Sequence, residues 1–305
     1  MHTAAGDLDG KVVEPFDFQQ SLNFLGGFGP MSGEQQFERG AITKAIMIEG
    51  QTVVFRVGET EEGGVRGKSR LRYELFSEGP LSKSVEDSVA RRIAFFLSLD
   101  DDVRPFYAIA RRDDPKFYPL VERSWGLHQV KFLTLLEISC WAILTQRVQR
   151  PIAQRMKRAI TEKFGGSLDL DGKTYRAFPD YTKLKEAKPR ELLEVTRNQR
   201  AMQRLTSLLT AFDELDEDYL RTAPYDKAAA RLQKVNGIGE WSSQFILFRG
   251  LGRMGKLQTI NVRPLSKAIE AVYSPKGKTL EEINSTYGEW SGYWSVYLRA
   301  STMSH

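Results

Sequence analysis

The spacing of the apolar residues changes once along this chain, near Ser82, and that change limits the folds that the chain can adopt. Before this point the apolar residues form short runs of the kind found in β-strands. Beyond it they recur every three or four residues, as Val85, Val89, Ile93 and Phe96 do, which is the period of a helix with one buried face. The sequence therefore predicts an α+β fold with its strands near the N-terminus.

The first 84 residues are predicted to form a small antiparallel sheet. Two runs, 41–48 and 51–57, flank the two-residue turn Glu49-Gly50, and such a pair is typical of a β-hairpin. Two further runs with a β-like pattern lie on either side, at 11–18 and 71–76. We expect an N-terminal α+β domain with an antiparallel sheet over residues 1–84.

Residues 85–305 are predicted to be mostly helical, and no convincing strand pattern returns there. The apolar segments of core length are 131–145, 152–164, 189–212 and 228–249. The acidic run from Asp213 to Asp218 lies between two helical patterns, so a solvated connection or a helix start is favoured over a metal site. A chain of 305 residues is long enough for two cores, or for one large core with a smaller appendage.

The composition excludes several classes of protein. One cysteine cannot form an internal disulfide or a four-cysteine metal site, and Cys140 lies in an apolar run that predicts a buried thiol. Three histidines, two of them at the chain ends, leave no cluster for a transition metal. No apolar run approaches the roughly 18 residues of a membrane span, and the N-terminus lacks the pattern of a secretory signal, so we expect no membrane partner. The 44 basic and 39 acidic residues give a net charge of +5, which suits a polyanionic partner.

The segment from Leu232 to Arg249 contains the most informative motif. Gly237 and Gly239 follow one helical pattern and directly precede another, which predicts a tight hairpin between two helices. Glycine lets the backbone approach a phosphate closely, and the N–H groups at the start of the second helix can then receive the anion. Such a hairpin would grip DNA without reading its bases. By spacing alone, an ordinary turn between helices with glycine at a C-cap fits nearly as well.

Two further segments follow the hairpin in a fixed order, and a third precedes it. They are Thr259 to Ala268, the aromatic segment Tyr287 to Trp294, and Ala142 to Val148 upstream. With the hairpin, they resemble the helix-hairpin-helix (HhH-GPD) DNA glycosylases, and most closely the AlkA-type alkyladenine (3-methyladenine) glycosylases. The resemblance covers roughly residues 85–301 and is strongest from 228 to 301. It implies two helical subdomains with a DNA-binding cleft between them.

The resemblance implies a site for a base that has been turned out of the duplex, a step that costs a few kcal/mol. Gln146 and Arg147 would fill the gap in the stack; a surface pair at a helix end is the alternative. Aromatic faces would hold an electron-poor alkylated base by stacking and cation–π attraction, although each could instead be plain core. The implied base pocket contains Trp241, Phe245, Trp290 and Tyr293, and the implied DNA contacts are Gln146, Arg147, Gly237, Gly239, Glu240, Trp241 and Ser242.

Position 261 departs from the family pattern. The resemblance places the family's catalytic aspartate, which opens a helix, on Asn261. Cleaving an N-glycosidic bond builds positive charge on the sugar, and an amide dipole stabilises that charge less than a carboxylate does. Glu270, about two and a half turns along the expected helix, is too distant to replace it. Three explanations remain open: an engineered Asp→Asn substitution that traps a complex, a natural variant with slow or altered activity, or a binding protein that has lost catalysis.

The resemblance also constrains the subtype. Glycosylases of this fold that also cut the strand form a Schiff base with a lysine just after the hairpin glycines, and Trp241 stands there instead. The resemblance thus implies a monofunctional hydrolase that removes 3-methyladenine or 7-methylguanine from double-stranded DNA. It implies a monomer that needs no cofactor and acts in the cytoplasm with the nucleoid, or in a eukaryotic nucleus. The backbone carbonyls of Gln233, Val235 and Gly237 match those that hold a monovalent cation, K⁺ or Na⁺, in that family.

Two other interpretations remain. A non-catalytic protein could bind damaged DNA with the same fold, and the residue at position 261 in close relatives would distinguish it from an enzyme. An unrelated basic α+β protein could contain the Gly-x-Gly turn by chance. Failure to bind any duplex DNA would favour this last interpretation.

Overall fold

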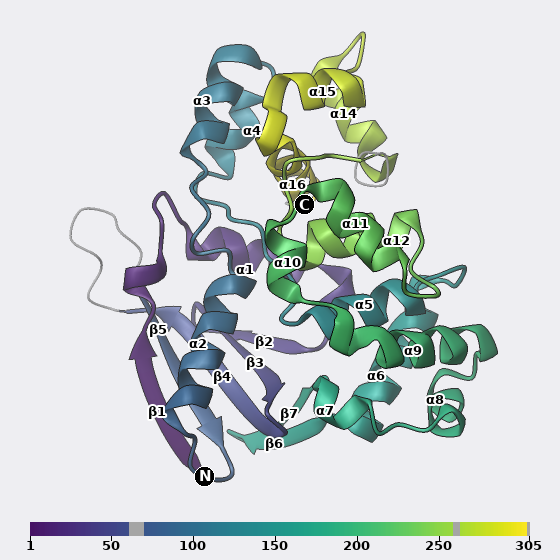
Figure 1. Ribbon diagram of the computed structural model, residues 1–305. Coiled ribbons are helices and arrows are strands. Elements are labelled where there is room, and N and C mark those ends of the chain that lie inside the picture. Colours follow the sequence, from purple (N-terminus) through teal and green to yellow (C-terminus); the bar gives the residue numbers. More distant parts are fainter. Residues whose placement is uncertain (61–69, 259–262, 304–305) are drawn as a thin grey trace.

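The computed structural model describes residues 1–60, 70–258 and 263–303 (Figure 1). A five-stranded sheet lies at one end of the molecule, and the helices extend away from it (Figure 1). Its strands are β1 (His2–Asp7), β2 (Gln35–Glu38), β3 (Ala41–Ile48), β4 (Gln51–Glu59) and β5 (Leu71–Ser77). They are ordered β1-β5-β4-β3-β2, and each neighbouring pair is antiparallel. The expected α+β fold class is confirmed.

The central hairpin of the sheet forms where the sequence predicts it. Ile48 at the end of β3 pairs with Gln51 at the start of β4. Glu49 and Gly50 between them have φ angles of 50° and 75°, the left-handed conformation that a two-residue hairpin turn requires. The hairpin register then places Ile42, Ile46, Val53 and Val57 on the face of the sheet that packs against the main core.

The prediction of a β-like run at 11–18 is wrong. A 3₁₀ turn, η1 (Asp9–Lys11), ends at the start of this run, and helix α1 (Phe18–Gly26) begins at its end. Asp17 caps α1, because its Oδ1 accepts a hydrogen bond from the backbone N–H of Gln20 at 3.1 Å. The buried residues Phe18, Leu22 and Leu25 then lie on one helical face, a period that the short run does not reveal.

The helices that follow the sheet begin at Ser82, as the change of apolar spacing predicts. Ser82 Oγ accepts a hydrogen bond from Val85 N at 3.3 Å and so caps α2 (Lys83–Phe96), whose Val85, Val89 and Ile93 are buried. The helices of the first half of this region are α3 (Arg104–Asp113), α4 (Tyr118–Arg123), α5 (Leu135–Leu144), α6 (Arg150–Phe164), α7 (Tyr181–Leu184), α8 (Pro189–Thr196) and α9 (Gln199–Ala211). Those of the second half are α10 (Glu217–Thr222), α11 (Tyr225–Gln233), α12 (Glu240–Phe245), the π-helical turn η4 (Ile246–Gly250), α14 (Ser266–Tyr273), α15 (Leu280–Tyr287) and α16 (Ser291–Ser301).

The acidic run at 213–218 starts a helix, as expected. Asp216 Oδ1 accepts hydrogen bonds from the backbone N–H groups of Asp218 and Tyr219, at 2.9 and 3.1 Å, and caps α10. Carboxylates are favourable in this position because they oppose the positive end of the helix dipole.

The expectation that no strand follows residue 82 is wrong. β6 (Gly166–Leu170) and β7 (Lys173–Ala177) form a second, two-stranded antiparallel sheet. Its apolar face packs on the side of the large sheet opposite the main core, where Leu168 and Tyr175 join Met47 and Val54 in a separate buried cluster. Each strand has only five residues, which is too short for alternation to stand out from the helical patterns around it.

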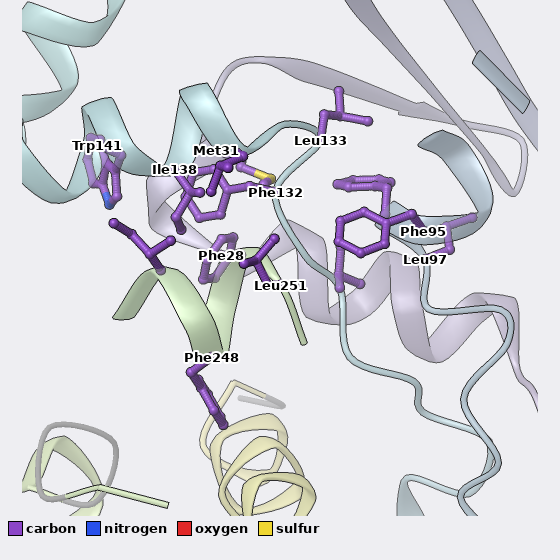
Figure 2. Packing of buried hydrophobic residues seen from close by; sticks show 14 of the residues in the cluster. Phe28, Met31, Phe95, Leu97, Phe132, Leu133, Ile138, Trp141, Phe248 and Leu251 are labelled. Carbon is purple, nitrogen blue, oxygen red and sulfur yellow. The ribbon is translucent and has the colours of Figure 1, made fainter. Parts of the chain in front are cut away.

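One continuous core connects the sheet to the helices and crosses residue 84 without a break. All ten residues of α5 are buried, including Cys140, as the sequence predicts. Figure 2 shows Phe28, which follows α1, among residues from other parts of the chain such as Phe132 and Leu251. The rings of Phe28 and Phe132 meet edge to face with centroids 6.0 Å apart. The N-terminal sheet and the helices are therefore packed against each other through side chains distant in sequence.

A buried ion-pair network also connects the two parts. Lys157 Nζ on α6 lies 2.7 Å from Glu137 Oε1 on α5 and 2.5 Å from Glu34 Oε1, just before β2. Lys44 Nζ on β3 contacts the other oxygen of Glu34 at 3.0 Å. Burial by itself would raise the pKa of Glu34, but Lys157 and Lys44 outweigh it and lower that pKa to about 2. Burial would likewise lower the pKa of Lys157, but Glu137 and Glu34 raise it, so Lys157 and Glu34 are both charged near neutral pH.

Candidate nucleic-acid interface

The predicted hairpin between two helices is present. α11 ends at Gln233 and α12 begins at Glu240, and Gly237 between them has a φ angle of +97°. A Cβ on Gly237 would lie 2.5 Å from Cγ of Arg204 on α9, so both backbone conformation and space require glycine here. The turn is thus packed tightly onto α9 on its inner side.

The second glycine of the hairpin, Gly239, has no such close neighbour among the described residues. A Cβ built on Gly239 would meet no atom of the described residues within 4 Å, so the backbone here borders open space. Gly239 is the N-cap of α12 and supplies no side chain to cap the N–H groups that follow. Such N–H groups at a helix start are oriented to receive an anion. Of the implied DNA contacts, Glu240 and Trp241 are exposed at this surface, whereas Ser242 is buried beneath it.

Gln146 ties this hairpin to the end of α5. Its Nε2 donates hydrogen bonds to the carbonyl oxygen of Gly237 at 2.7 Å and to Ser242 Oγ at 3.0 Å. Its Oε1 accepts a hydrogen bond from Arg204 Nη1. The structure therefore shows Gln146 as a half-buried support of the hairpin, held through both ends of its amide.

Arg147 is the exposed member of the pair. It has a φ angle of 57°, a left-handed conformation that is uncommon for a residue with a long side chain. Within the described part of the chain, its guanidinium makes no ion pair or hydrogen bond. It borders a cleft of about 430 Å³ whose other walls include Gln146, Arg204, Gly239 and Trp241. A free cation beside the hairpin is consistent with a group that projects into DNA.

Trp241 also lines a second cavity, which has a volume of about 260 Å³. Trp241 is 44% exposed and stacks on Phe245, with the two rings 5.2 Å apart and 6° from parallel. Both residues line this cavity, together with Phe248 and Arg249 from η4. Trp241 thus borders both the cleft beside the hairpin and this aromatic cavity, which fits the implied path of a base out of the duplex.

The structure places Tyr293 in the core rather than in this cavity. Tyr293 is 1% exposed, its ring packs 5.9 Å from that of Phe106, and its hydroxyl donates a hydrogen bond to Asp101. Burial, together with the negative charge of Asp101, raises the pKa of Tyr293 well above its ordinary value. Trp290 is half-buried against Tyr293, at 5.8 Å between ring centres, and is also absent from the described lining of the cavity.

Asn261 lies outside the described residues, so the prediction of its role rests on the resemblance alone. The chain that is described resumes at Arg263 and enters α14 through Pro264, which lines the aromatic cavity. Position 261 is therefore three residues from a wall of that cavity. Glu270 is an exposed residue of α14.

The resemblance implies that the carbonyl groups of Gln233, Val235 and Gly237 bind a cation, and two of these groups accept hydrogen bonds within the protein. The carbonyl oxygen of Val235 accepts a hydrogen bond from Ile238 N at 2.9 Å, and that of Gly237 accepts the one from Gln146. A carbonyl oxygen has two lone pairs, so each can still face a cation. Neutral oxygen ligands fit a hard monovalent cation, whereas the described residues contain no cluster of three histidine, cysteine or acidic side chains suited to another metal.

Known proteins are similar to this chain in sequence and in architecture. No family model matches the chain. A DNA-3-methyladenine glycosylase of Bacillus subtilis (strain 168) is 26% identical over 269 residues, which cover 86% of each protein. The structure of a 3-methyladenine DNA-glycosylase from Archaeoglobus fulgidus matches all of both chains with a TM-score of 0.72 and 17% identity. The chain has the helix-hairpin-helix DNA glycosylase fold.

This glycosylase fold is shared by relatives with different substrates. The 8-oxoguanine glycosylase/lyase of Clostridium acetobutylicum matches 94% of this chain and 93% of its own with a TM-score of 0.63 and 19% identity. The resemblance predicted from the hairpin and the segments around it is thereby confirmed. Of the described helices, none is both long and apolar enough to cross a bilayer.

Proposed function

We propose that this chain binds double-stranded DNA that contains a damaged base and removes the base by hydrolysis of its glycosidic bond. The observation that supports this function most directly is that Trp241 borders both the cleft beside the hairpin, where the backbone of Gly239 is open, and an aromatic cavity. The hairpin would hold the phosphates, Arg147 would fill the gap in the stack, and the cavity would receive the base. The similarity to a 3-methyladenine glycosylase supports alkylated bases such as 3-methyladenine and 7-methylguanine as substrates.

The reaction we propose is monofunctional, without strand cleavage. Formation of a Schiff base with the sugar needs an amine nucleophile after the hairpin glycines. Trp241 occupies that place and stacks on Phe245 instead. Water would therefore add to the sugar carbon that the base leaves. The product would be an uncleaved strand that contains an abasic site.

Asn261 supports a second candidate, a protein that binds damaged DNA without excising the base. The fold needs a carboxylate near the sugar for efficient hydrolysis, by the resemblance, and asparagine provides only a dipole. If Asn261 replaces the aspartate of an enzyme, by engineering or naturally, the rest of the cavity still supports catalysis. In a true binding protein the cavity does not. Restoring the carboxylate at position 261 distinguishes the two cases.

The remaining proposals follow from the resemblance. A K⁺ or Na⁺ ion held by the carbonyls of Gln233, Val235 and Gly237 would stiffen the hairpin and add positive charge beside a phosphate. No cofactor would take part in the reaction. The protein would act as a monomer on DNA in the nucleoid, or in the nucleus of a eukaryote.

Binding to a duplex with an abasic-site analogue is expected to exceed binding to the undamaged duplex at every salt concentration. Both affinities should fall steeply with salt, because the protein releases counterions from the phosphates it contacts. Fluorescence anisotropy across a salt titration measures both. Equal affinity for the two duplexes would contradict recognition of damage, and no binding to either would overturn the proposal of a DNA partner.

Substitution of Arg147 by alanine should weaken binding to the abasic analogue about tenfold more than binding to undamaged duplex. Only a missing or rotated base leaves a gap for this side chain, and one well-placed contact accounts for roughly 1 to 3 kcal/mol. Arg200→Ala, at the start of α9, is the matched control for the loss of one exposed charge. An equal loss on both duplexes would show that Arg147 contacts phosphate only.

A further inference from the structure

The side chain of Gln146 lies where three elements meet. Helix α5 ends two residues before it, and α5 contacts both α9 and α12 (Figure 1). The Nε2 of Gln146 donates hydrogen bonds to the carbonyl oxygen of Gly237 at 2.7 Å and to Ser242 Oγ at 3.0 Å. Its Oε1 accepts a hydrogen bond from Arg204 Nη1. One amide group thus joins the end of α5 to the hairpin and to α9.

The neighbours of this amide favour a single orientation. A guanidinium group can only donate hydrogen bonds, and a carbonyl oxygen can only accept them. If the amide were rotated by half a turn, its NH₂ group would face Arg204 and its oxygen would face the carbonyl oxygen of Gly237. Both hydrogen bonds would then be lost. Arg204 therefore determines which end of the Gln146 amide faces the hairpin.

Arg204 is itself packed against the hairpin. A Cβ on Gly237 would lie 2.5 Å from Cγ and 2.8 Å from Cβ of Arg204, so the stem of this arginine touches the turn. Arg204 is half-buried, and within residues 1–60, 70–258 and 263–303 it forms no ion pair with an acidic side chain. The acceptor that meets its charge is the neutral Oε1 of Gln146. A charged donor polarises the amide, which strengthens the hydrogen bonds that Nε2 donates to the hairpin.

The same contacts hold the backbone that carries Arg147. The backbone N–H of Gln146 donates to the carbonyl oxygen of Ile143 at 3.2 Å, and Arg147 follows with its left-handed φ angle of 57°. Since the backbone and the side chain of Gln146 are both held, the start of the Arg147 side chain has a defined position relative to Gly237. Both Arg147 and the hairpin border the cleft of about 430 Å³. The group proposed to fill the gap and the hairpin proposed to hold the phosphates are therefore connected through one amide.

We propose that Arg204 is a positioning residue, which holds Gln146 so that Arg147 and the hairpin engage damaged DNA as one unit. The inference rests on the proposed function, because it needs a hairpin that holds phosphates and a gap that Arg147 fills. On undamaged duplex only the hairpin is engaged, so a rigid connection adds little. On a duplex with a gap both are engaged at once, and two groups held in the correct relative position bind more tightly than the same groups joined loosely.

Arg204→Met tests this role, because methionine keeps part of the stem that packs on Gly237 and removes every donor. We expect the ratio of two affinities, for abasic analogue over undamaged duplex, to fall about tenfold in fluorescence anisotropy at one salt concentration. Arg204→Lys keeps a charged donor and should recover most of the ratio. Arg200→Met removes an exposed charge one turn earlier on α9, so it should weaken binding to both duplexes alike and leave the ratio unchanged.

A double-mutant cycle distinguishes positioning from direct contact with DNA. If Arg204 acts through Gln146, Arg204→Met should not lower the ratio further in a Gln146→Leu background. If the guanidinium of Arg204 contacts DNA itself, the substitution should cost as much in that background as in the wild type.

Gln146→Glu examines the connection from its other end. A carboxylate still accepts a hydrogen bond from Arg204, but it cannot donate to Gly237 or Ser242. We expect the ratio to fall as it does in Arg204→Met. This variant decides the question if thermal unfolding shows that Arg204→Met does not fold, because Arg204 can act on the hairpin through Gln146 only while Nε2 donates.

The possible outcomes distinguish this inference from the proposed function. An unchanged ratio in Arg204→Met or in Gln146→Glu, with the wild-type preference for the abasic duplex present, would overturn the positioning role and leave the proposed function standing. A full further loss in the Gln146→Leu background, or an equal loss on both duplexes, would assign Arg204 to direct contact with DNA and also overturn it. Absence of any preference for the abasic duplex in the wild type would overturn the proposed function itself.

Discussion

Replacing Asn261 by aspartate is expected to raise the rate of base release by at least about 100-fold, the scale of one preorganised electrostatic group. A carboxylate next to the sugar stabilises the positive charge that develops as the glycosidic bond breaks, most strongly where water is excluded. Single-turnover assays on duplexes with 3-methyladenine or 7-methylguanine measure the effect, because slow product release would hide it in steady-state rates. Binding to an abasic analogue should change little.

The control for this experiment is Thr259→Asp. It introduces the same carboxylate two residues earlier, and so tests the register that the resemblance assigns to the aspartate position. A rise in Asn261→Asp alone supports an enzyme whose carboxylate has been replaced. A rise in Thr259→Asp alone would show that the assigned register is wrong. No rise in either variant, on every base tried, would leave the DNA-binding protein as the function.

Replacing Lys157 by methionine is expected to destabilise the protein by about 3 to 5 kcal/mol, the usual cost of removing one partner from a buried ion pair. Lys157 is 3% exposed and faces both Glu137 and Glu34, so its loss leaves the buried Glu137 without a positive partner among the described residues and Glu34 with Lys44 alone. Urea unfolding followed by circular dichroism measures the change. The double variant Lys157→Met/Glu137→Gln should recover part of the loss, since it removes one of the carboxylates that the lysine neutralised.

The acid dependence of stability provides a second measurement on the same network. The pKa of Glu34 falls from an ordinary 4.5 to about 2 on folding, so its charge stabilises the wild type above pH 4.5. That stabilisation is lost as the pH falls from 4.5 to about 2. Lys157→Met should flatten this part of the profile, because the lysine is the principal group that lowers the pKa of Glu34. An unaltered profile would show that the network contributes little to folding.

The sequence by itself determined the elements whose signals are local. The hairpin around Glu49-Gly50 follows from two strand-like runs that are joined by a turn of two residues. The start of α2 near Ser82 follows from the change to helical spacing of the apolar residues at that point. Gly237 could be recognised because its positive φ angle is a local requirement for glycine, whereas the close approach of Arg204, which also requires glycine there, comes from α9. The fold class and the place of the hairpin could be predicted for that reason.

The tertiary structure alone decided which surfaces meet. An aromatic residue at helical spacing is buried whether it faces a cavity or the core, so no local pattern distinguishes Tyr293, which belongs to the core, from Phe245, which lines the cavity. The contact between Gln146 and Arg204 has no sequence signal either, since the two residues lie 58 positions apart and each resembles an ordinary surface residue in its own segment. Burial and hydrogen bonding at such a site depend on distant parts of the chain, and packing is what brings those parts together.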